Sequence, residues 1–302
     1  MGPMALAQAS RRRWTGAMNP DAVVVGVDHS SASQTAVAWA ANRALRTGSH
    51  LVLVHVVDPS LPGEYAGNAR IDADLALTVS YLKDNAPGLE YSIELERGDP
   101  ITELARLGSQ GALLVIGTHK TGYVQGRVFG SLSIRLAAVS VAPLAVIPAR
   151  SSLHPTGVVV GIDLTSAGIS AIRFAAIEAA ALGEDLTLVY AHGTPSEEQG
   201  DGGAEIGALA RDIVRTAAPN TDIRVRTVNR GAAEALIDIA ASAGLLVVGS
   251  SRRHRPGAGA LGPVSFDVLV NIPTPTIVVH PPVGSHTPFI SRRRASAAAP
   301  PQ

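Results

Sequence analysis

A glycine-punctuated loop holds the residues of this sequence that are best suited to chemistry. Residues 115–133 read V-I-G-T-H-K-T-G-Y-V-Q-G-R-V-F-G-S-L-S, with an apolar run before Gly117 and an amphipathic segment after Gly130 and Ser131. This order predicts a strand, a loop and a helix. Glycines let a backbone approach a ligand closely, and the first turn of a helix presents unpaired N–H groups to anions. The loop is therefore suited to phosphate, although its spacing fits neither the P-loop nor the dinucleotide fingerprint.

The elements that would position this loop alternate between strand and helix. Apolar, β-branched runs predict strands at residues 23–27, 51–57, 91–95, 113–116 and 143–147. Helical patterns lie between them at residues 36–45, 71–85 and 100–107, and again after residue 130. Such alternation is typical of a doubly wound parallel sheet, and nearly continuous apolar strands indicate burial on both faces.

The same order of elements then begins again. V-V-V-G-V-D at residues 23–28 recurs as V-V-V-G-I-D at residues 158–163, which is 135 residues later. Three landmarks of the first half recur 132 residues later, namely Gly117 as Gly249, Gly130 as Gly262 and Pro143 as Pro275. Nearly constant offsets indicate a duplication. We predict domains at residues 20–150 and 155–282, a disordered extension at 1–19 with Met18 as an alternative start, and a disordered tail at 283–302.

Composition argues against several classes of partner and site. The 25 Lys and Arg residues balance 25 Asp and Glu residues, so no net charge favours nucleic acid or an anionic membrane. Cysteine is absent, and the nine histidines lack a close metal-ligand spacing, so we expect no metal site. No run approaches 18 apolar residues, and no signal-peptide core follows the arginines at 11–13. We therefore expect a cytoplasmic protein.

Four local features together resemble one known family. They are the strand that ends in Asp28, L-V-H-V-V-D at 53–58, the loop from Gly117 to Gly130-Ser131, and A-P-L-A-V-I-P at 142–148. Over residues 20–148 and 156–281 the sequence resembles the universal stress protein family in its tandem, two-domain form. The nucleotide motif of that family is Gly, two residues, Gly, nine residues, Gly, then Ser or Thr. Lys120 stands where the motif has its second Gly.

The resemblance implies a fold and a ligand. The fold is two tandem five-stranded parallel sheets of strand order 3-2-1-4-5, as in adenine-nucleotide α-hydrolase-like proteins, with ligand at the point where the order reverses. The ligand is ATP, with or without Mg²⁺, bound mainly by the first domain. Asp28 would bind the ribose or adenine side, and Val56 would line the adenine pocket. The full set of implied binding residues is Gly26, Val27, Asp28, Val56, Ile116, Gly117, Lys120, Gly130, Ser131, Leu132 and Ser133.

Several of these residues also have a purely structural interpretation. Asp28 could cap the following helix, which is a common use of Asp after a strand. Lys120 could reach phosphate with its amine or crowd the pocket. We expect His119 and Arg127 to be exposed loop residues, and His55 to be a hydrogen-bonded core histidine.

The second half departs further from the motif. Its loop, G-S-S-R-R-H-R-P-G-A-G-A-L-G-P, keeps Gly249 and Gly262 but has Arg252 at the second Gly position and Pro263 in place of Ser or Thr. Proline has neither an N–H nor a hydroxyl, so two phosphate donors are lost. We expect a second site that is weaker, altered or vacant, with Asp163 retained as a helix cap.

Three functions follow, in order of preference. The first is a non-enzymatic, adenine-nucleotide-binding regulator of the stress response, because no general base, nucleophile or acidic metal-ligand pair is visible at the loop; slow ATP hydrolysis stays open. The second is an interaction module whose nucleotide sites have decayed. The third is an enzyme of the wider α-hydrolase-like group, ranked last because its H-x-G-H and S-G-G-x-D-S motifs are absent.

Assembly is predicted from the last strand of each half. L-A-V-I-P and T-I-V-V-H-P could pair within the chain as a pseudo-dimer, since unpaired strand edges tend to be covered. We also expect a homodimer and a protein partner whose identity the sequence does not reveal.

Overall fold

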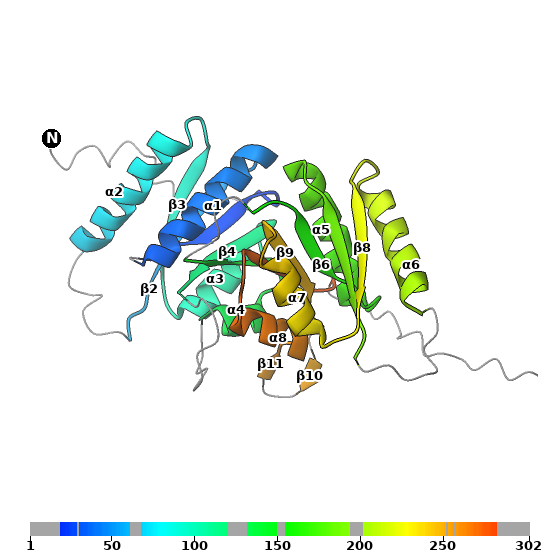
Figure 1. The fold of residues 1–302 in the computed structure, drawn as a ribbon. Coiled ribbons are helices and arrows are strands. Elements are labelled where there is room, and N and C mark those ends of the chain that lie inside the picture. Colours follow the sequence, from blue (N-terminus) through cyan, green and yellow to red (C-terminus); the bar gives the residue numbers. More distant parts are fainter. Residues whose placement is uncertain are drawn as a thin grey trace, which may run out of the picture.

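The structure is a computed structural model that describes residues 19–28, 30–60, 68–119, 132–149, 155–193, 202–251, 253–255 and 258–282. Ten strands form one continuous sheet of order β3-β2-β1-β4-β5-β12-β9-β6-β7-β8 (Figure 1). Each half contributes five parallel strands in the order 3-2-1-4-5, as the sequence predicts. In the described part of the chain, no helix has the length and apolar character needed to span a membrane.

The first half alternates strands and helices from Val23 onward. Its elements are β1 (Val23–Gly26), α1 (Ser31–Thr47), β2 (Leu51–Val57), α2 (Asn68–Asn85), β3 (Tyr91–Arg97), α3 (Pro100–Gly108), β4 (Leu113–Thr118), α4 (Leu132–Val139) and β5 (Leu144–Pro148). Helix α1 starts five residues earlier than the apolar pattern alone indicates, because Ser30 caps it by accepting a hydrogen bond from the Ser33 N–H.

The second half follows the same order with one addition. Its elements are β6 (Val158–Gly161), α5 (Ser166–Leu182), β7 (Leu186–Ala191), α6 (Gly202–Ala217), β8 (Ile223–Val228), α7 (Ala232–Ala240), β9 (Leu245–Gly249), β10 (Arg253–Arg255), β11 (Ala258–Ala260), α8 (Pro263–Val270) and β12 (Thr276–Val279). The addition is a small antiparallel ribbon of β10 and β11, within the loop that corresponds to the one between β4 and α4 of the first half.

Helices cover both faces of the sheet, so successive strand residues enter different cores. Val23 and Val25 belong to a core on one face that also includes residues of α1, α2, α5 and α6. Val24 belongs to a core on the other face that also includes residues of α3, α4, α7 and α8. Because side chains alternate across a strand, a strand buried on both faces must be apolar throughout, which explains the unbroken valine runs.

The two halves join through their last strands. β5 and β12 pair antiparallel, with Leu144 opposite Val278 and Val146 opposite Thr276, and this confirms the pairing predicted within the chain. Every residue of both strands is buried. The join therefore removes two sheet edges and leaves β3 and β8 as the outer strands.

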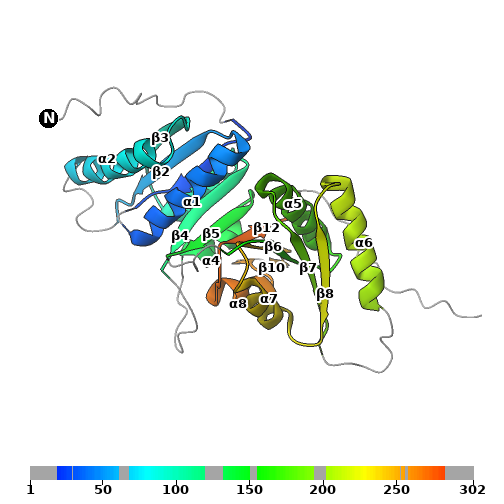
Figure 2. The same cartoon turned by 45° about the horizontal axis from the view of Figure 1, so that its top comes forward.

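A buried ion pair lies beside this join, where α1 meets α5 (Figure 2). The Arg43 Nε donates to Glu178 Oε2 at 3.1 Å, and an Arg43 Nη2–Glu178 Oε1 contact makes the pair bidentate. The side chains are only 12% and 4% exposed. The two residues are 135 positions apart, so they occupy equivalent positions in the repeat. Opposite charges therefore face each other where a symmetric pairing of identical halves would bring like charges together.

This ion pair predicts a charge-exchange result. Replacing Arg43 by Gln leaves the buried Glu178 carboxylate without its partner and should lower the free energy of unfolding by about 3 kcal/mol. The double exchange of Arg43→Glu with Glu178→Arg restores opposite charges and should recover most of the stability lost in Arg43→Glu, as measured by urea unfolding. The exposed ion pair made by Arg106 is the control, since Arg106→Gln should cost less than about 1 kcal/mol. A double exchange that is no more stable than Arg43→Glu would contradict this interpretation.

Candidate functional site

The candidate site lies at the carboxyl edge of the first half, where β1 and β4 run side by side. Val25 of β1 pairs with Val115 of β4, and β2 pairs with the opposite side of β1. Strand order reverses between β1 and β4, so the loops that leave these two strands diverge to opposite faces and open a crevice. Eight candidate residues are described at this edge: Gly26, Val27, Asp28, Val56, Ile116, Gly117, Leu132 and Ser133. Lys120, Gly130 and Ser131 lie outside the described residues, as does Arg127.

Asp28 is exposed and shapes the turn between β1 and α1. Its Oδ1 accepts the Ser30 N–H at 2.8 Å, and its own N–H donates to the Ser33 Oγ at 3.0 Å. Ser30, not Asp28, is the helix cap. A carboxylate has about four acceptor positions, and the turn described here uses one of them. The other acceptor positions of the carboxylate have no partner among the hydrogen bonds of the described residues.

The apolar residues at the ends of β1 and β2 face different cores. Val27, directly after β1, is buried in the core that includes α1, whereas Val56 of β2 is half-buried against the core that contains Leu104. His55 is 7% exposed, and its Nδ1 lies 2.8 Å from the Val27 carbonyl oxygen. This confirms His55 as a hydrogen-bonded core histidine.

Gly117 has a structural role that the motif alone does not reveal. A Cβ at Gly117 would lie 2.2 Å from the Ala32 carbonyl oxygen and 2.7 Å from the Ser33 nitrogen. The glycine therefore lets the end of β4 approach the first turn of α1. Gly249 does the same in the second half, where a Cβ would lie 2.6 Å from the Ala167 oxygen. Recurrence of this glycine in both halves consequently follows from helix packing and does not by itself indicate a ligand.

The other described candidates divide between core and surface. The Ile116 side chain is 2% exposed and lies 3.5 Å from the Cβ position of Gly26, so it belongs to the core. Leu132 is 39% exposed and Ser133 is 3% exposed at the start of α4. His119, which follows β4, is exposed as predicted.

One further carboxylate near this edge is used as a helix cap. Asp99 follows β3 and caps α3, where its Oδ2 accepts from the Thr102 N–H at 2.9 Å and from the Thr102 Oγ1 at 2.7 Å. The hydroxyl bond above all, and then the backbone bond, hold the pKa of Asp99 below its ordinary value. Asp99 is therefore a charged cap whose hydrogen bonds are local. Sequence analysis missed it, although D-P-I-T after a strand is a recognisable helix start.

In the second half, the corresponding helix start is closed by its own side chains. The Gly262 N–H donates to the Ser250 Oγ at 3.2 Å, and the Ser265 Oγ donates to the Gly249 carbonyl at 3.0 Å. Pro263 occupies the first helical position. The two positions that correspond to Gly130 and Ser131 thus offer a phosphate no free donor, because the Gly262 N–H is already bonded and Pro263 has neither an N–H nor a hydroxyl.

Asp163 makes the same kind of turn as Asp28. Its Oδ1 accepts from the Thr165 N–H at 3.0 Å and from the Thr165 Oγ1 at 2.8 Å, and Thr165 caps α5. The acidic residue after the first strand therefore supports the helix start in both halves. A ligand role for Asp28 has to rest on its surroundings and not on its position in the turn.

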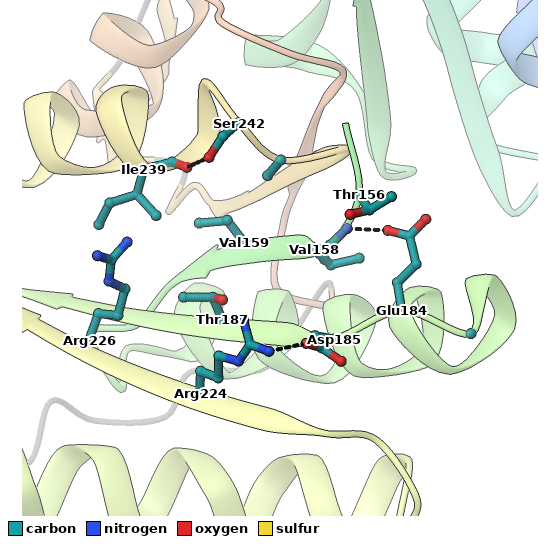
Figure 3. A pocket seen from close by; sticks show the side chains of 13 residues that line it. Thr156, Val158, Val159, Glu184, Asp185, Thr187, Arg224, Arg226, Ile239 and Ser242 are labelled. Carbon is teal, nitrogen blue, oxygen red and sulfur yellow. Dashed lines mark hydrogen bonds and ion pairs between the residues drawn. The ribbon is translucent and has the colours of Figure 1, made fainter. Parts of the chain in front are cut away.

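A cavity of about 450 Å³ lies at the opposite, amino edge of the second half (Figure 3). Its walls come from the residues around the starts of β6, β7 and β8 and from the end of α7 and the residues after it. The Glu184 carboxylate accepts the Gly157 N–H, and Arg224 pairs with Asp185 at 2.6 Å. Both carboxylates thus have partners within the protein, and open α/β sheets bind ligands at the carboxyl edge, so we do not assign this cavity to the site.

The close approach at Gly117 predicts the effect of a single methyl group. Gly117→Ala should destabilise the protein by roughly 1–3 kcal/mol, because backbone atoms of α1 cannot yield as a side chain can. Gly26→Ala is the matched control, since its Cβ would meet only side-chain atoms, of Leu104 at 3.3 Å and of Ile116 at 3.5 Å, and should cost less than about 1 kcal/mol. Thermal unfolding of both variants measures the difference. Equal losses of stability in the two variants would show that the close approach of β4 to α1 does not determine the cost of Gly117→Ala.

Comparison with known proteins gives a consistent family assignment by sequence. The model of the Universal stress protein family matches residues 20–148 and again residues 156–280. Universal stress protein Rv3134c of Mycobacterium tuberculosis is 32% identical over 250 residues, which cover 80% of this chain and 92% of the relative. Universal stress protein Rv2623 of the same organism is 29% identical over 283 residues, covering 85% of this chain and 95% of the relative.

Solved structures show the same fold. A universal stress protein from Archaeoglobus fulgidus superimposes with a TM-score of 0.65 at 16% identity, covering 87% of this chain and 99% of that one. A putative universal stress protein from Pseudomonas aeruginosa gives a TM-score of 0.54 at 17% identity over 87% of this chain and 93% of that one. With two matches of the family model in succession, the chain belongs to the universal stress protein family and carries two of its domains in tandem.

Proposed function

We propose that the first half binds an adenine nucleotide, with ATP as the ligand, and that the protein acts as a regulator in the stress response. The observation that carries this proposal is the exposed Asp28 carboxylate at the β1–β4 switch point. Carboxylates at this position of open α/β sheets are well placed to accept hydrogen bonds from ribose hydroxyls.

The wall beside Asp28 has the character that a purine ring requires. Val56 is half-buried and packs on a core that includes Ile101 and Leu104. The apolar surface would cover one face of the adenine, while backbone groups at the strand ends could meet its polar edge. We assign Val56 to the adenine side of the site, and Val27, whose side chain packs in the core on the α1 side, would border the ligand through its backbone.

The phosphates would lie at the start of α4. The positive end of the helix dipole favours anions, and Leu132 and Ser133 stand in the first turn of α4. Gly130, Ser131 and Lys120 would complete the cradle and remain predictions. A Mg²⁺ ion would reach the site with the nucleotide phosphates, because the described residues include no group of three or more metal-ligating side chains.

A regulator is favoured over an enzyme by the uses of the nearby titratable groups. His55 is hydrogen-bonded to Val27 within the core, and Asp99 caps α3. Neither is positioned as a general base for an attacking water. Bound nucleotide would then act by changing a surface for a protein partner or for self-association as a homodimer.

A second candidate function rests on the second half. At its helix start the Gly262 N–H already donates to the Ser250 Oγ, the Ser265 Oγ donates to the Gly249 carbonyl, and Pro263 has no N–H. If the first half had a similarly closed loop, the protein would be an interaction module without nucleotide. The two proposals differ in whether ATP binds to the purified chain.

The proposed site predicts an unequal effect of two equivalent substitutions. Asp28→Asn keeps an oxygen to accept the Ser30 N–H but removes the charge, so it should weaken ATP binding about tenfold, or about 1.4 kcal/mol, in isothermal titration calorimetry. Asp163→Asn, the matched change in the second half, should leave the affinity unchanged. The proposal fails if the wild-type chain shows no binding at millimolar ATP, or if both variants lose affinity equally.

A further inference from the structure

His280 lies at the boundary between the two halves and contacts both of them. It directly follows β12 and is 8% exposed. Its Nδ1 lies 2.8 Å from the Ser250 carbonyl oxygen of its own half. Its Nε2 lies 2.9 Å from the Ala137 carbonyl oxygen on α4 of the first half. The ring thus bridges the segment after β9 and the helix that follows the nucleotide loop.

Both contacts require the ring to be the donor. A carbonyl oxygen can only accept a hydrogen bond, and a neutral imidazole carries a hydrogen on one nitrogen only. A neutral His280 would therefore point a nitrogen lone pair at one of the two carbonyl oxygens. Rotating the ring by half a turn would place carbon atoms at both positions and lose both bonds. The doubly protonated imidazolium satisfies both Ser250 and Ala137.

The end of α4 is a favourable place for this charge. The last four carbonyls of a helix lack partners within it and carry its partial negative charge. In α4, the Ser140 N–H bonds to the Leu136 carbonyl at 2.7 Å, and His280 bonds to the next carbonyl, that of Ala137. His280 therefore caps the C-terminal end of α4 from the other half of the chain.

The charged side chains that α4 and α8 carry are Arg135 and Asp267. Arg135 on α4 is exposed and acts electrostatically on Asp99 of the first half. Asp267 on α8 is exposed. The cationic run that follows Ser250 in the sequence, Arg252 to Arg255, has side chains outside the described part of the structure. The two carbonyl bonds and the end of α4 both favour the charged ring.

The second half makes this contact with a helix of the first half, and the first half has no equivalent histidine that could make it in return. In the repeat, the position of His280 corresponds to Pro148 in the first half, which has no side-chain donor. At the end of α8, the Asn271 Nδ2 donates to the Asp267 carbonyl at 3.0 Å, so that helix is capped by its own residue. The second half therefore holds α4, whereas no equivalent histidine of the first half holds α8.

We infer that His280 is a positioning residue whose imidazolium fastens α4 to the second half and so sets the orientation of the helix that begins at the phosphate end of the nucleotide site. The link is complete while the ring carries both protons. When pH rises and one proton leaves, one of the two hydrogen bonds is lost and α4 loosens. The consequence for nucleotide affinity rests on the proposed function, whereas the link itself does not.

The charge on the ring can be measured on the wild-type chain without any variant. Nitrogen-15 NMR of ring-labelled protein distinguishes an imidazolium from a neutral ring, and His280→Gln identifies the signal by its disappearance. We expect His280 to be doubly protonated at pH 7, where an unperturbed imidazole is mostly neutral. A neutral tautomer at pH 7 would overturn the inference.

Amide hydrogen exchange tests the link to α4. The side-chain amide of Gln in His280→Gln has a single nitrogen, which cannot bond to the Ser250 and Ala137 carbonyls together. The end of α4 should then open more often, and exchange at the Ser140 amide should be about tenfold faster than in wild type. In the wild type, the exchange rate at Ser140, corrected for the intrinsic effect of pH, should also rise as pH rises and His280 loses a proton. In His280→Gln the corrected rate should not change with pH. His192→Gln, which removes a histidine elsewhere in the second half, is the control and should behave as wild type. Unchanged exchange in His280→Gln would overturn the link.

Calorimetry with ATP separates this inference from the proposed function. We expect His280→Gln to bind ATP several-fold more weakly than wild type at pH 6.5, with a smaller difference at pH 8.5. If wild type binds no ATP, the proposed function fails, and the NMR and exchange results still decide the link. If ATP binds both proteins equally at both values of pH, the coupling of His280 to the site is wrong.

Discussion

The antiparallel pairing of β5 with β12 is the contact on which the rest of the structure depends. A single five-stranded half would expose its last strand, which is buried throughout and has no charged residue to protect it. Joining the two apolar strands makes one sheet whose outer strands, β3 and β8, carry charged side chains such as Glu96 and Arg224. Each half thereby supplies the missing neighbour of the other, and the helices near the join, α1 with α5 and α4 with α8, come into contact.

The sequence was sufficient to predict the fold because the relevant signals are local and repeated. The valine runs identify β1 and β6, and the offsets of the repeat align the two halves. The apolar pattern alone places helix boundaries less accurately: it predicts a start at Ala36, whereas Ser30, one of three serines before it that could serve as an N-cap, starts α1 at Ser31. The capping bond depends on a serine hydroxyl and a backbone N–H, which the hydrophobic periodicity does not register.

The site was only partly predictable, since one residue can serve packing and binding at once. Gly117 belongs to the nucleotide motif of the family, yet its close approach to Ala32 requires glycine in any case. Asp28 is likewise part of a turn that recurs at Asp163. The contacts across the boundary between the halves, such as His280 with Ala137, join residues 143 positions apart and carry no local pattern. They depend on how the two halves pack, which periodicity and motif spacing do not encode.

The pairing of Arg43 with Glu178 indicates what duplication made possible. In a complex of two identical subunits, every residue on the symmetry axis meets its own copy, so a mutation there changes both sides at once. Fusing two copies into one gene frees each position to mutate alone, and an acid can then evolve opposite a base. The two domains are therefore complementary and no longer interchangeable. A chain made of two copies of the same domain would bring two arginines, or two glutamates, together at the buried position that Arg43 and Glu178 now share.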